Sequence, residues 1–151
     1  MRLDYTKASP GGAKVIGGVY GYVAQSGLED ALVDLVYFRV SQINGCAYYL
    51  DLHARDLLRK GMMPEKLSLV QAWQEMDCVF SQRERAALAW AEAVMRVALT
   101  PVSDLDFARA IEVFTEKELV DLTVAVGLMS IYNQLAISFR RMPEKAPNRK
   151  K

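Results

Sequence analysis

Apolar residues recur at spacings of three and four along almost the whole chain, and segments that strictly alternate apolar and polar residues are scarce. The first pattern is typical of helices that bury one face, whereas half-buried strands need the second. The sequence therefore predicts an all-α fold of about seven helices with no sheet. Its 151 residues, of which 52% are hydrophobic and 25% charged, suit one soluble domain with a sizeable core.

Turn and capping residues divide the chain into these helices. Asn44-Gly45 predicts a helix end, because both residues tolerate positive φ, and the spans Ser81–Glu84 and Thr115–Glu118 are capping boxes that predict helix starts. The expected helices are, in chain order, one from Pro10 onward, then 28–42, 46–60, 64–73, 83–99, 104–114, and 118–140, the last of which ends before Pro143.

Two of these helices carry unusual residues. The first is rich in glycine, and Gly17 and Gly21 predict a close helix crossing. The second, 28–42, is apolar nearly all round and is expected to be buried. It contains Arg39, and a buried arginine needs a carboxylate, for which Asp34 and Glu75 are the candidates.

Charge and cysteine content restrict the partners and the compartment. The net charge of +1 gives no strong field for nucleic acid or an anionic membrane, and the N-terminus lacks an apolar signal region, so we expect a cytoplasmic protein. We expect a helical domain over residues 1–141 and a basic, disordered tail over 142–151. Two cysteines and one histidine predict neither a structural disulfide nor a bound metal, and no motif indicates a cofactor. The long apolar faces predict a homo-oligomer.

One face of the helix expected at 46–60 carries the candidate chemistry. At 100° per residue, Cys46, Tyr49 and His53 share a mainly apolar stripe, and Asp51 and Arg55 lie on the opposite side, where they can pair. A cysteine at a helix start lies where the helix dipole lowers the pKa of a thiol, and His53 on the same face could take its proton. A buried cysteine and histidine that only pack in the core remain the alternative.

The segment FRVSQINGCAYYLDLHARDLLRKG resembles the core of the carboxymuconolactone decarboxylase and AhpD-like alkylhydroperoxidase family. The segments AWQEMDCVFSQRERAALAWAEAV and TEKELVDLTVAVGLMSIYNQLA are also similar to that family, so the resemblance covers about residues 3–140. It implies an AhpD-like helical bundle whose subunits form homo-oligomers, from dimers to hexamers.

The redox branch of that family carries a Cys-x-x-Cys-x-x-x-His motif, and this chain matches it in part. Cys46 stands at the first thiol position and His53 at the histidine position, but Tyr49 replaces the second thiol and is expected to line the pocket. The family also places a glutamate of a proton relay twelve residues before the first cysteine, where this chain has Asp34. The resemblance thus assigns catalytic roles to Cys46, His53 and Asp34.

These matches imply an oxidoreductase that reduces peroxides through a cysteine thiol, with reduced or altered activity because the second thiol is missing. An external thiol is then the expected reductant, since a sulfenic acid needs a thiol to resolve it. Cys78 is a weaker candidate for that role. The alternative is a redox-inactive oligomeric binding or scaffold member of the family. The decarboxylase branch relies on a histidine elsewhere, and His53 is the only histidine here.

Overall fold

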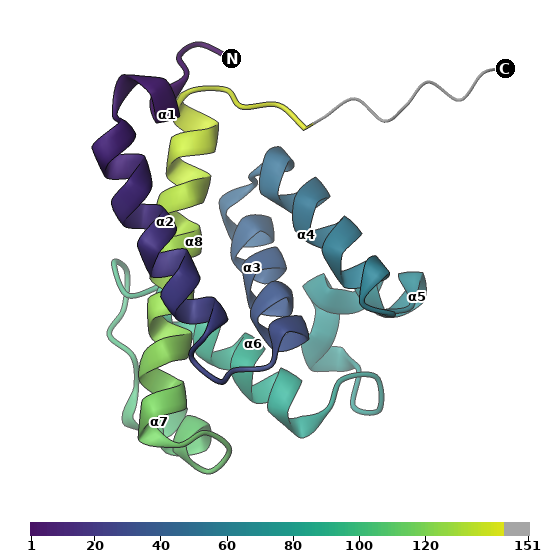
Figure 1. The fold of residues 1–151 in the computed structure, drawn as a ribbon. Coiled ribbons are helices and arrows are strands. Elements are labelled where there is room, and N and C mark those ends of the chain that lie inside the picture. The colour runs from purple at the N-terminus through teal and green to yellow at the C-terminus, as the bar shows by residue number, and fades with distance from the viewer. Residues whose placement is uncertain (144–151) are drawn as a thin grey trace, which may run out of the picture.

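The computed structural model describes residues 1–143, which form eight α-helices and one 3₁₀ helix and contain no strand (Figure 1). The predicted all-α class is therefore confirmed for this part of the chain. The elements are α1 (Tyr5–Ala8), α2 (Pro10–Ala24), α3 (Asp30–Asn44), α4 (Ala47–Arg59), α5 (Pro64–Leu69), η1 (Val70–Glu75), α6 (Gln82–Met95), α7 (Asp104–Ile111) and α8 (Glu116–Ser138). The tail predicted over 142–151 lies outside the described residues from 144 onward.

Helix α3 is the central element, as its apolar sequence predicted. It packs against α4, α6 and α8. Nine of its fifteen residues are buried, and they point to every side of the helix. The main hydrophobic core surrounds it, and a smaller core around Leu35, Leu57 and Trp73 fills the space towards α5 and η1. The buried polar residues of α3, Asp34 and Ser41, are therefore held inside the domain.

The α3–α4 junction is defined by the local sequence. Gly45 adopts the left-handed conformation, with a φ of 65°. The Gly45 N–H donates to the Gln42 carbonyl and the Cys46 N–H to the Ser41 carbonyl, at 3.2 and 3.0 Å, which is the Schellman pattern of a helix end. The chain turns sharply there, so Cys46 becomes the N-cap of α4. Both predicted capping boxes are also present, at the starts of α6 and α8.

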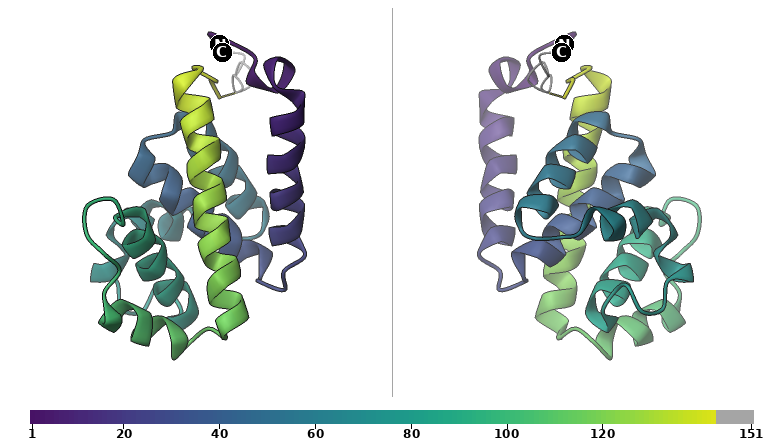
Figure 2. Two further views of the ribbon diagram at one scale, coloured as in Figure 1. Left: turned by 90° about the vertical axis from the view of Figure 1, so that its left-hand side faces the viewer. Right: turned by 90° about the vertical axis from the view of Figure 1, so that its right-hand side faces the viewer.

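Helices α2 and α8 lie side by side and antiparallel (Figures 1 and 2). The prediction of a close crossing at Gly17 and Gly21 is wrong, because no atom lies within 4 Å of the position that a Cβ would occupy at either glycine. Contact is made instead by the other face of α2, where the Tyr22 hydroxyl donates to Asp121 of α8 at 2.7 Å. Most of α2 is exposed, and Val23 is its one buried residue.

Arg39 finds its carboxylate on α6, not at either candidate named from the sequence. Its Nε lies 2.8 Å from Glu92 Oε1, and the Trp73 indole N–H donates to the same oxygen at 2.8 Å. The single helix predicted over 64–73 is divided into α5 and the 3₁₀ helix η1, which extends to Glu75 and has non-helical backbone angles at Ala72. The Arg39–Glu92 pair could not be predicted from local spacing, because Glu92 lies 53 residues after Arg39.

Helix α8 is, among the helices of residues 1–143, the one whose length and composition would allow it to cross a membrane. Of the window that passes this test, 44% is buried inside the domain. Buried Asp121 and Asn133 on α8 also make hydrogen bonds to other helices. A core helix passes the same test, so the membrane evidence is weak.

Candidate functional site

Helices α3 and α4 bring Asp34 and His53 together, as the resemblance implied. The Nδ1 atom of His53 lies 3.5 Å from Asp34 Oδ1, and Lys60, just after α4, donates from Nζ to Asp34 Oδ2 at 2.6 Å. Both partners of the pair are buried, with 7% of Asp34 and 3% of His53 exposed. Asp34 therefore holds one histidine and one lysine on its two oxygens.

The charge of Asp34 is stabilised by these neighbours. Burial by itself raises the pKa of the Asp34 carboxyl, but the interactions with His53 and Lys60 outweigh it and leave the pKa below its ordinary value. The carboxyl group is consequently ionised at neutral pH. The ionised Asp34 carboxylate lies beside Nδ1 of the imidazole, so Nδ1 is the ring nitrogen placed to donate a proton towards it.

His53 has unused hydrogen-bonding capacity. Neither ring nitrogen has a hydrogen-bond partner of good geometry, although the ring is almost completely buried. The rings of Tyr37 and Tyr49 flank it, with centroids at 5.1 and 5.9 Å. A buried polar side chain without partners is rare in structural positions and is typical of a site where a ligand or a proton is exchanged.

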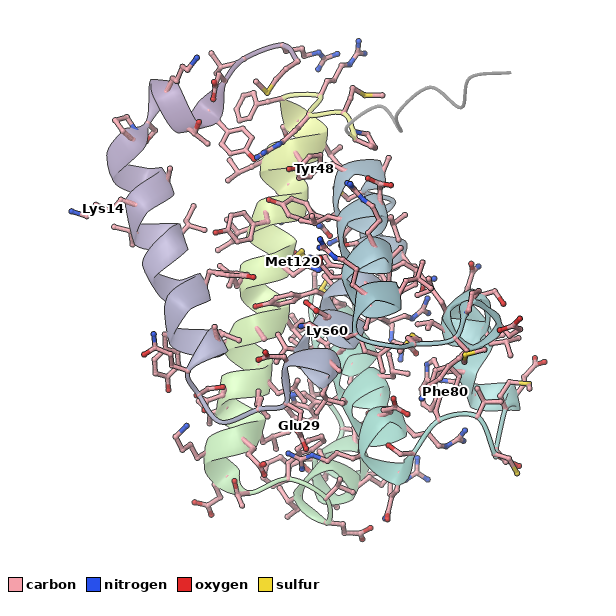
Figure 3. The ribbon with its side chains drawn as sticks, turned by 45° about the vertical axis from the view of Figure 1, so that its right-hand side comes forward. Lys14, Glu29, Tyr48, Lys60, Phe80 and Met129 are labelled. Atoms are coloured by element: carbon pink, nitrogen blue, oxygen red, sulfur yellow. The ribbon has the colours of Figure 1, made fainter. Side chains whose placement is uncertain are left out.

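Two hollows adjoin the pair. A cavity of about 120 Å³ lies beside Asp34 and Tyr37, and it has room for ordered water. A larger pocket of about 300 Å³ lies beside His53, between α4 and α8. We call it the His53 pocket, and its lining residues are Tyr20, Tyr48, Tyr49, Leu52, His53, Asp56, Met129, Tyr132 and Arg141. Figure 3 shows Tyr48 and Met129 in the region between α4 and α8, with Lys60 near the end of α4.

Tyr49 fills the position of the second thiol and lines the His53 pocket. Its ring stacks on His53 and lies 5.6 Å from the Tyr132 ring of α8. Burial raises the pKa of the Tyr49 hydroxyl above its ordinary value, so the side chain stays neutral. Tyr49 thus supplies a wall of the pocket and no nucleophile.

Cys46 is placed differently from the sequence expectation. It is 1% exposed, belongs to the main hydrophobic core, and lines neither hollow. Burial raises the pKa of the Cys46 thiol, and the amides of Tyr49 and Tyr48 lower it by less. The predicted lowering of this pKa by the helix start is therefore wrong. His53 is two turns further along α4, about 10 Å along the axis, so it does not reach the thiol directly.

The two cysteines are expected to react very differently with a thiol reagent. Cys78 is exposed and Cys46 is buried, and both are free. In the folded protein at pH 7, Cys78 should be modified quickly, and Cys46 should be modified at least on the order of a hundredfold more slowly. Because the thiolate reacts and the pKa is raised, the Cys46 rate should rise about tenfold per pH unit. Stopped-flow labelling with a disulfide reagent measures this, and Cys78→Ser removes the fast phase as a control.

A different result would change this picture. If Cys46 in the Cys78→Ser variant is modified as fast as a free thiol at pH 7, its sulfur is reachable and ionised in the native state. If it is modified only under unfolding conditions, with no dependence on pH below the transition, it is a core residue.

The same cluster offers ligands to a metal ion. Asp34, His53 and Asp56 each present one ligand atom, and these atoms all lie within 4.8 Å of one another. Basic neighbours already balance both carboxylates, since Lys60 pairs with Asp34 and Arg59 with Asp56. The donor set suits a divalent cation only if those basic side chains move away.

Several pocket residues were not found from the sequence. Arg141 lies after the end of α8, and Tyr20 and Tyr132 come from α2 and α8. No local motif marks them, because their relation to His53 arises only when α2 and α8 pack beside α4. Among the residues of the site that sequence reasoning missed, Lys60 is the one with a local signal, because a basic residue next to a helix end is a common position for an interaction with a neighbouring acidic group.

Comparison with known proteins relates the whole chain to a family. The model of the carboxymuconolactone decarboxylase family matches residues 11–93. The uncharacterized protein YdfG of Bacillus subtilis is 30% identical over 138 residues, which are 91% of this chain and 93% of YdfG.

Solved structures share the fold. A protein of unknown function from Agrobacterium tumefaciens, named as a candidate antioxidant defence protein AhpD, is 34% identical and superposes with a TM-score of 0.89 over 95% of this chain and 99% of that one. The debrominase Bmp8 is 17% identical, with a TM-score of 0.80 over 93% of this chain and 75% of its own, and is similar in fold alone.

Proposed function

Since this chain belongs to the carboxymuconolactone decarboxylase family, as its sequence implied, we propose that it is an AhpD-like oxidoreductase that reduces peroxides slowly through the single thiol of Cys46. One observation carries the proposal. The Asp34–His53 pair, with 3.5 Å between Nδ1 and Oδ1, supports a proton-transfer role, because His53 lies beside a pocket and on the helix that Cys46 caps.

The proposed reaction needs one protein thiol and two equivalents of an external thiol. The Cys46 thiolate attacks one oxygen of the peroxide, the O–O bond breaks, and the departing alkoxide takes a proton to become an alcohol, which leaves a sulfenic acid on Cys46. An external thiol attacks that sulfur and releases water, and a second external thiol releases Cys46 and leaves as a disulfide. The Cys46 thiol first gives up its proton through water to the His53 imidazole, whose imidazolium form Asp34 stabilises, and the same proton then returns through water to the alkoxide.

The structure explains why this reaction would be slow. A free cysteine is only a few per cent ionised at pH 7. Burial raises the pKa of the Cys46 thiol, so its ionised fraction is smaller still. Cys46 and the neighbouring Tyr49 are also buried, so peroxide reaches the sulfur only through a local opening of the structure. A thiol with a raised pKa loses reactivity as the pH falls, so turnover should increase with pH.

Peroxide consumption tests the proposal. We expect the purified protein to consume cumene hydroperoxide with dithiothreitol as the reductant, at a rate that rises from pH 6 to pH 9. Cys46→Ser should fall to the background rate, because serine cannot form the sulfenic acid, while Cys78→Ser should keep the full rate. Dimedone should label the sulfur of Cys46 in peroxide-treated protein. Equal rates in Cys46→Ser and the unmodified protein would exclude this function.

A second candidate function is a redox-inactive binding member of the family. The observation that favours it is that Cys46 lines neither of the two hollows described above, while His53 lines the His53 pocket and its buried ring nitrogens have no hydrogen-bond partner. Such a protein shows background peroxide consumption and no dimedone adduct, and it still binds a ligand at His53. Assembly into a homo-oligomer and a cytoplasmic location remain predictions under either function.

A further inference from the structure

We propose that the His53 pocket binds a small planar aromatic ligand with one anionic group, and that Arg141 holds the anion. The inference names a substrate class for the proposed function and rests on that function in one respect. The substrate would be an aromatic peroxide, in which the peroxide group is attached to the ring that the pocket binds. The evidence is an arginine with no acidic partner, an unusual backbone turn that places it, and walls made of aromatic rings.

Arg141 lies at the pocket without a carboxylate. Its Nη1 donates to the Tyr5 hydroxyl at 2.8 Å, and no acidic side chain of residues 1–143 forms an ion pair with it. Its guanidinium lies over the Tyr48 ring, 4.2 Å from the centroid, and 5.9 Å from that of Tyr5. These rings fix the plane of the guanidinium and leave most of its N–H groups available, an arrangement that suits a carboxylate or phenolate.

A costly turn puts Arg141 in this position. Arg140 has a φ of 53° and is the one residue other than glycine with positive φ among residues 1–143. The Arg140 N–H donates to Ile137 and the Arg141 N–H to Ala136, which is the Schellman pattern. The same pattern ends α3 and α4, but there glycine, Gly45 or Gly61, takes the strained position.

The strain at Arg140 indicates selection for the position of Arg141. A left-handed residue other than glycine costs about 1 kcal/mol or more. Arg140 itself is exposed and does not line the pocket. The turn folds the chain back from the end of α8 so that Arg141 reaches Tyr48 on α4.

The walls of the pocket favour a flat ring. The ring of Tyr49 lies 5.6 Å from that of Tyr132 and perpendicular to that of Tyr48, at 86°. Aromatic walls bind aromatic ligands through offset stacking and edge contacts. The volume of about 300 Å³ is at the small end of ligand sites, so a single ring with short substituents fits.

The other polar groups of the pocket agree with one anion rather than two. His53 lines it, and its ring nitrogens are buried without a hydrogen-bond partner. Asp56 also lines the pocket, and its charge is balanced by Arg59. A ligand with one anionic group pairs with Arg141 and leaves a neutral or proton-accepting end for His53.

Calorimetric titration with three matched probes tests the inference. Benzoate carries the ring and the charge, benzamide carries the ring alone, and cyclohexanecarboxylate carries the charge without a flat ring. We expect benzoate to bind on the order of tenfold more tightly than either analogue, since a charged hydrogen-bonded pair and aromatic contacts each contribute about that factor. Equal binding of all three probes, or no benzoate binding in the millimolar range, would overturn the inference.

Two arginine variants with the same charge change separate the pocket from general electrostatics. Arg141→Gln should weaken benzoate binding about tenfold or more and leave benzamide binding unchanged, which also shows that the pocket is still folded. Arg140→Asn should leave both unchanged, because asparagine tolerates the left-handed turn. Equal losses of benzoate affinity in the two variants would contradict a specific role of Arg141.

Benzoate contains no peroxide, so these titrations do not depend on turnover. Benzoate binding without peroxide consumption in the unmodified protein would refute the proposed function and retain the ligand class. Peroxide consumption that requires Cys46, without benzoate binding, would refute the ligand class and retain the proposed function.

Discussion

Tyr49→Cys is expected to form a disulfide with Cys46 under mild oxidation and to raise peroxide turnover by on the order of a hundredfold. Positions 46 and 49 are three apart at the start of α4, so their Cβ atoms face each other across one helical turn. That separation suits disulfide geometry after a small adjustment. The new thiol also removes the need for an external thiol to resolve the sulfenic acid.

Loss of the tyrosine ring contributes a second effect. Tyr49 is 7% exposed, and its ring contacts those of Tyr48, Tyr132 and His53. Truncation should lower the free energy of unfolding by about 2–4 kcal/mol. It also opens a path from the His53 pocket to the sulfur of Cys46.

Two control variants separate the opened path from the restored dithiol. Tyr49→Ser creates a similar space without a thiol, so it should raise thiol labelling of Cys46 but give much less turnover than Tyr49→Cys. The double variant Tyr49→Cys with Cys46→Ser tests whether the new thiol acts alone. Non-reducing peptide mapping detects the disulfide. A folded Tyr49→Cys protein without the disulfide and without added turnover would show that more than one thiol separates this chain from a peroxidase.

The sequence predicted the parts of the fold that local chemistry determines. Gly45 ends α3 because that position needs positive φ, and the buried helix 28–42 could be identified because apolar residues surround it. Asp51 and Arg55 pair at 2.6 Å, as four-residue spacing on a helix implies. The Asp34–His53 contact was implied only through the family resemblance.

The failures concern properties that depend on packing between distant segments. The pKa of Cys46 follows from the core that closes over it, and the helix start contributes less than burial. Glycines in α2 suggested a close crossing, but the direction in which α2 presents them depends on its packing against α8. Arg141 was assigned to no site. Nothing in the sequence after α8 indicates that Arg140 adopts a left-handed backbone conformation and turns the chain back towards α4.

Glu92→Ala is expected to be the most destabilising polar substitution we propose. The carboxylate is 7% exposed and accepts hydrogen bonds from Arg39, Trp73 and Gln74, at 2.8, 2.8 and 3.4 Å. Its removal leaves the partly buried guanidinium of Arg39 without a counter-ion and the Trp73 indole N–H without an acceptor. The free energy of unfolding in urea should fall by about 3–5 kcal/mol.

Three further variants test the cause of this loss. Glu92→Gln keeps an acceptor for the indole and removes only the charge, so it should cost about 1.5–3 kcal/mol. Asp51→Ala removes an exposed ion pair of similar length and should cost about 0.5 kcal/mol or less. The double variant Arg39→Met with Glu92→Leu should recover much of the stability lost in Glu92→Ala, because it leaves no unpaired buried charge. A double variant no more stable than Glu92→Ala would show that lost packing dominates.

The Glu92 variants also identify the motion that exposes Cys46. The Arg39–Glu92 pair links α3 to α6, whereas Cys46 is the N-cap of α4. If the thiol becomes reachable only on global unfolding, its labelling should accelerate on the order of a hundredfold or more in Glu92→Ala, in proportion to the lost stability. If a local opening of α4 suffices, as the proposed peroxide reaction requires, Glu92→Ala should label Cys46 at nearly the unmodified rate, and Tyr49→Ser should accelerate it. An acceleration in Glu92→Ala that matches the stability change would therefore leave peroxide no route to the sulfur in the folded protein.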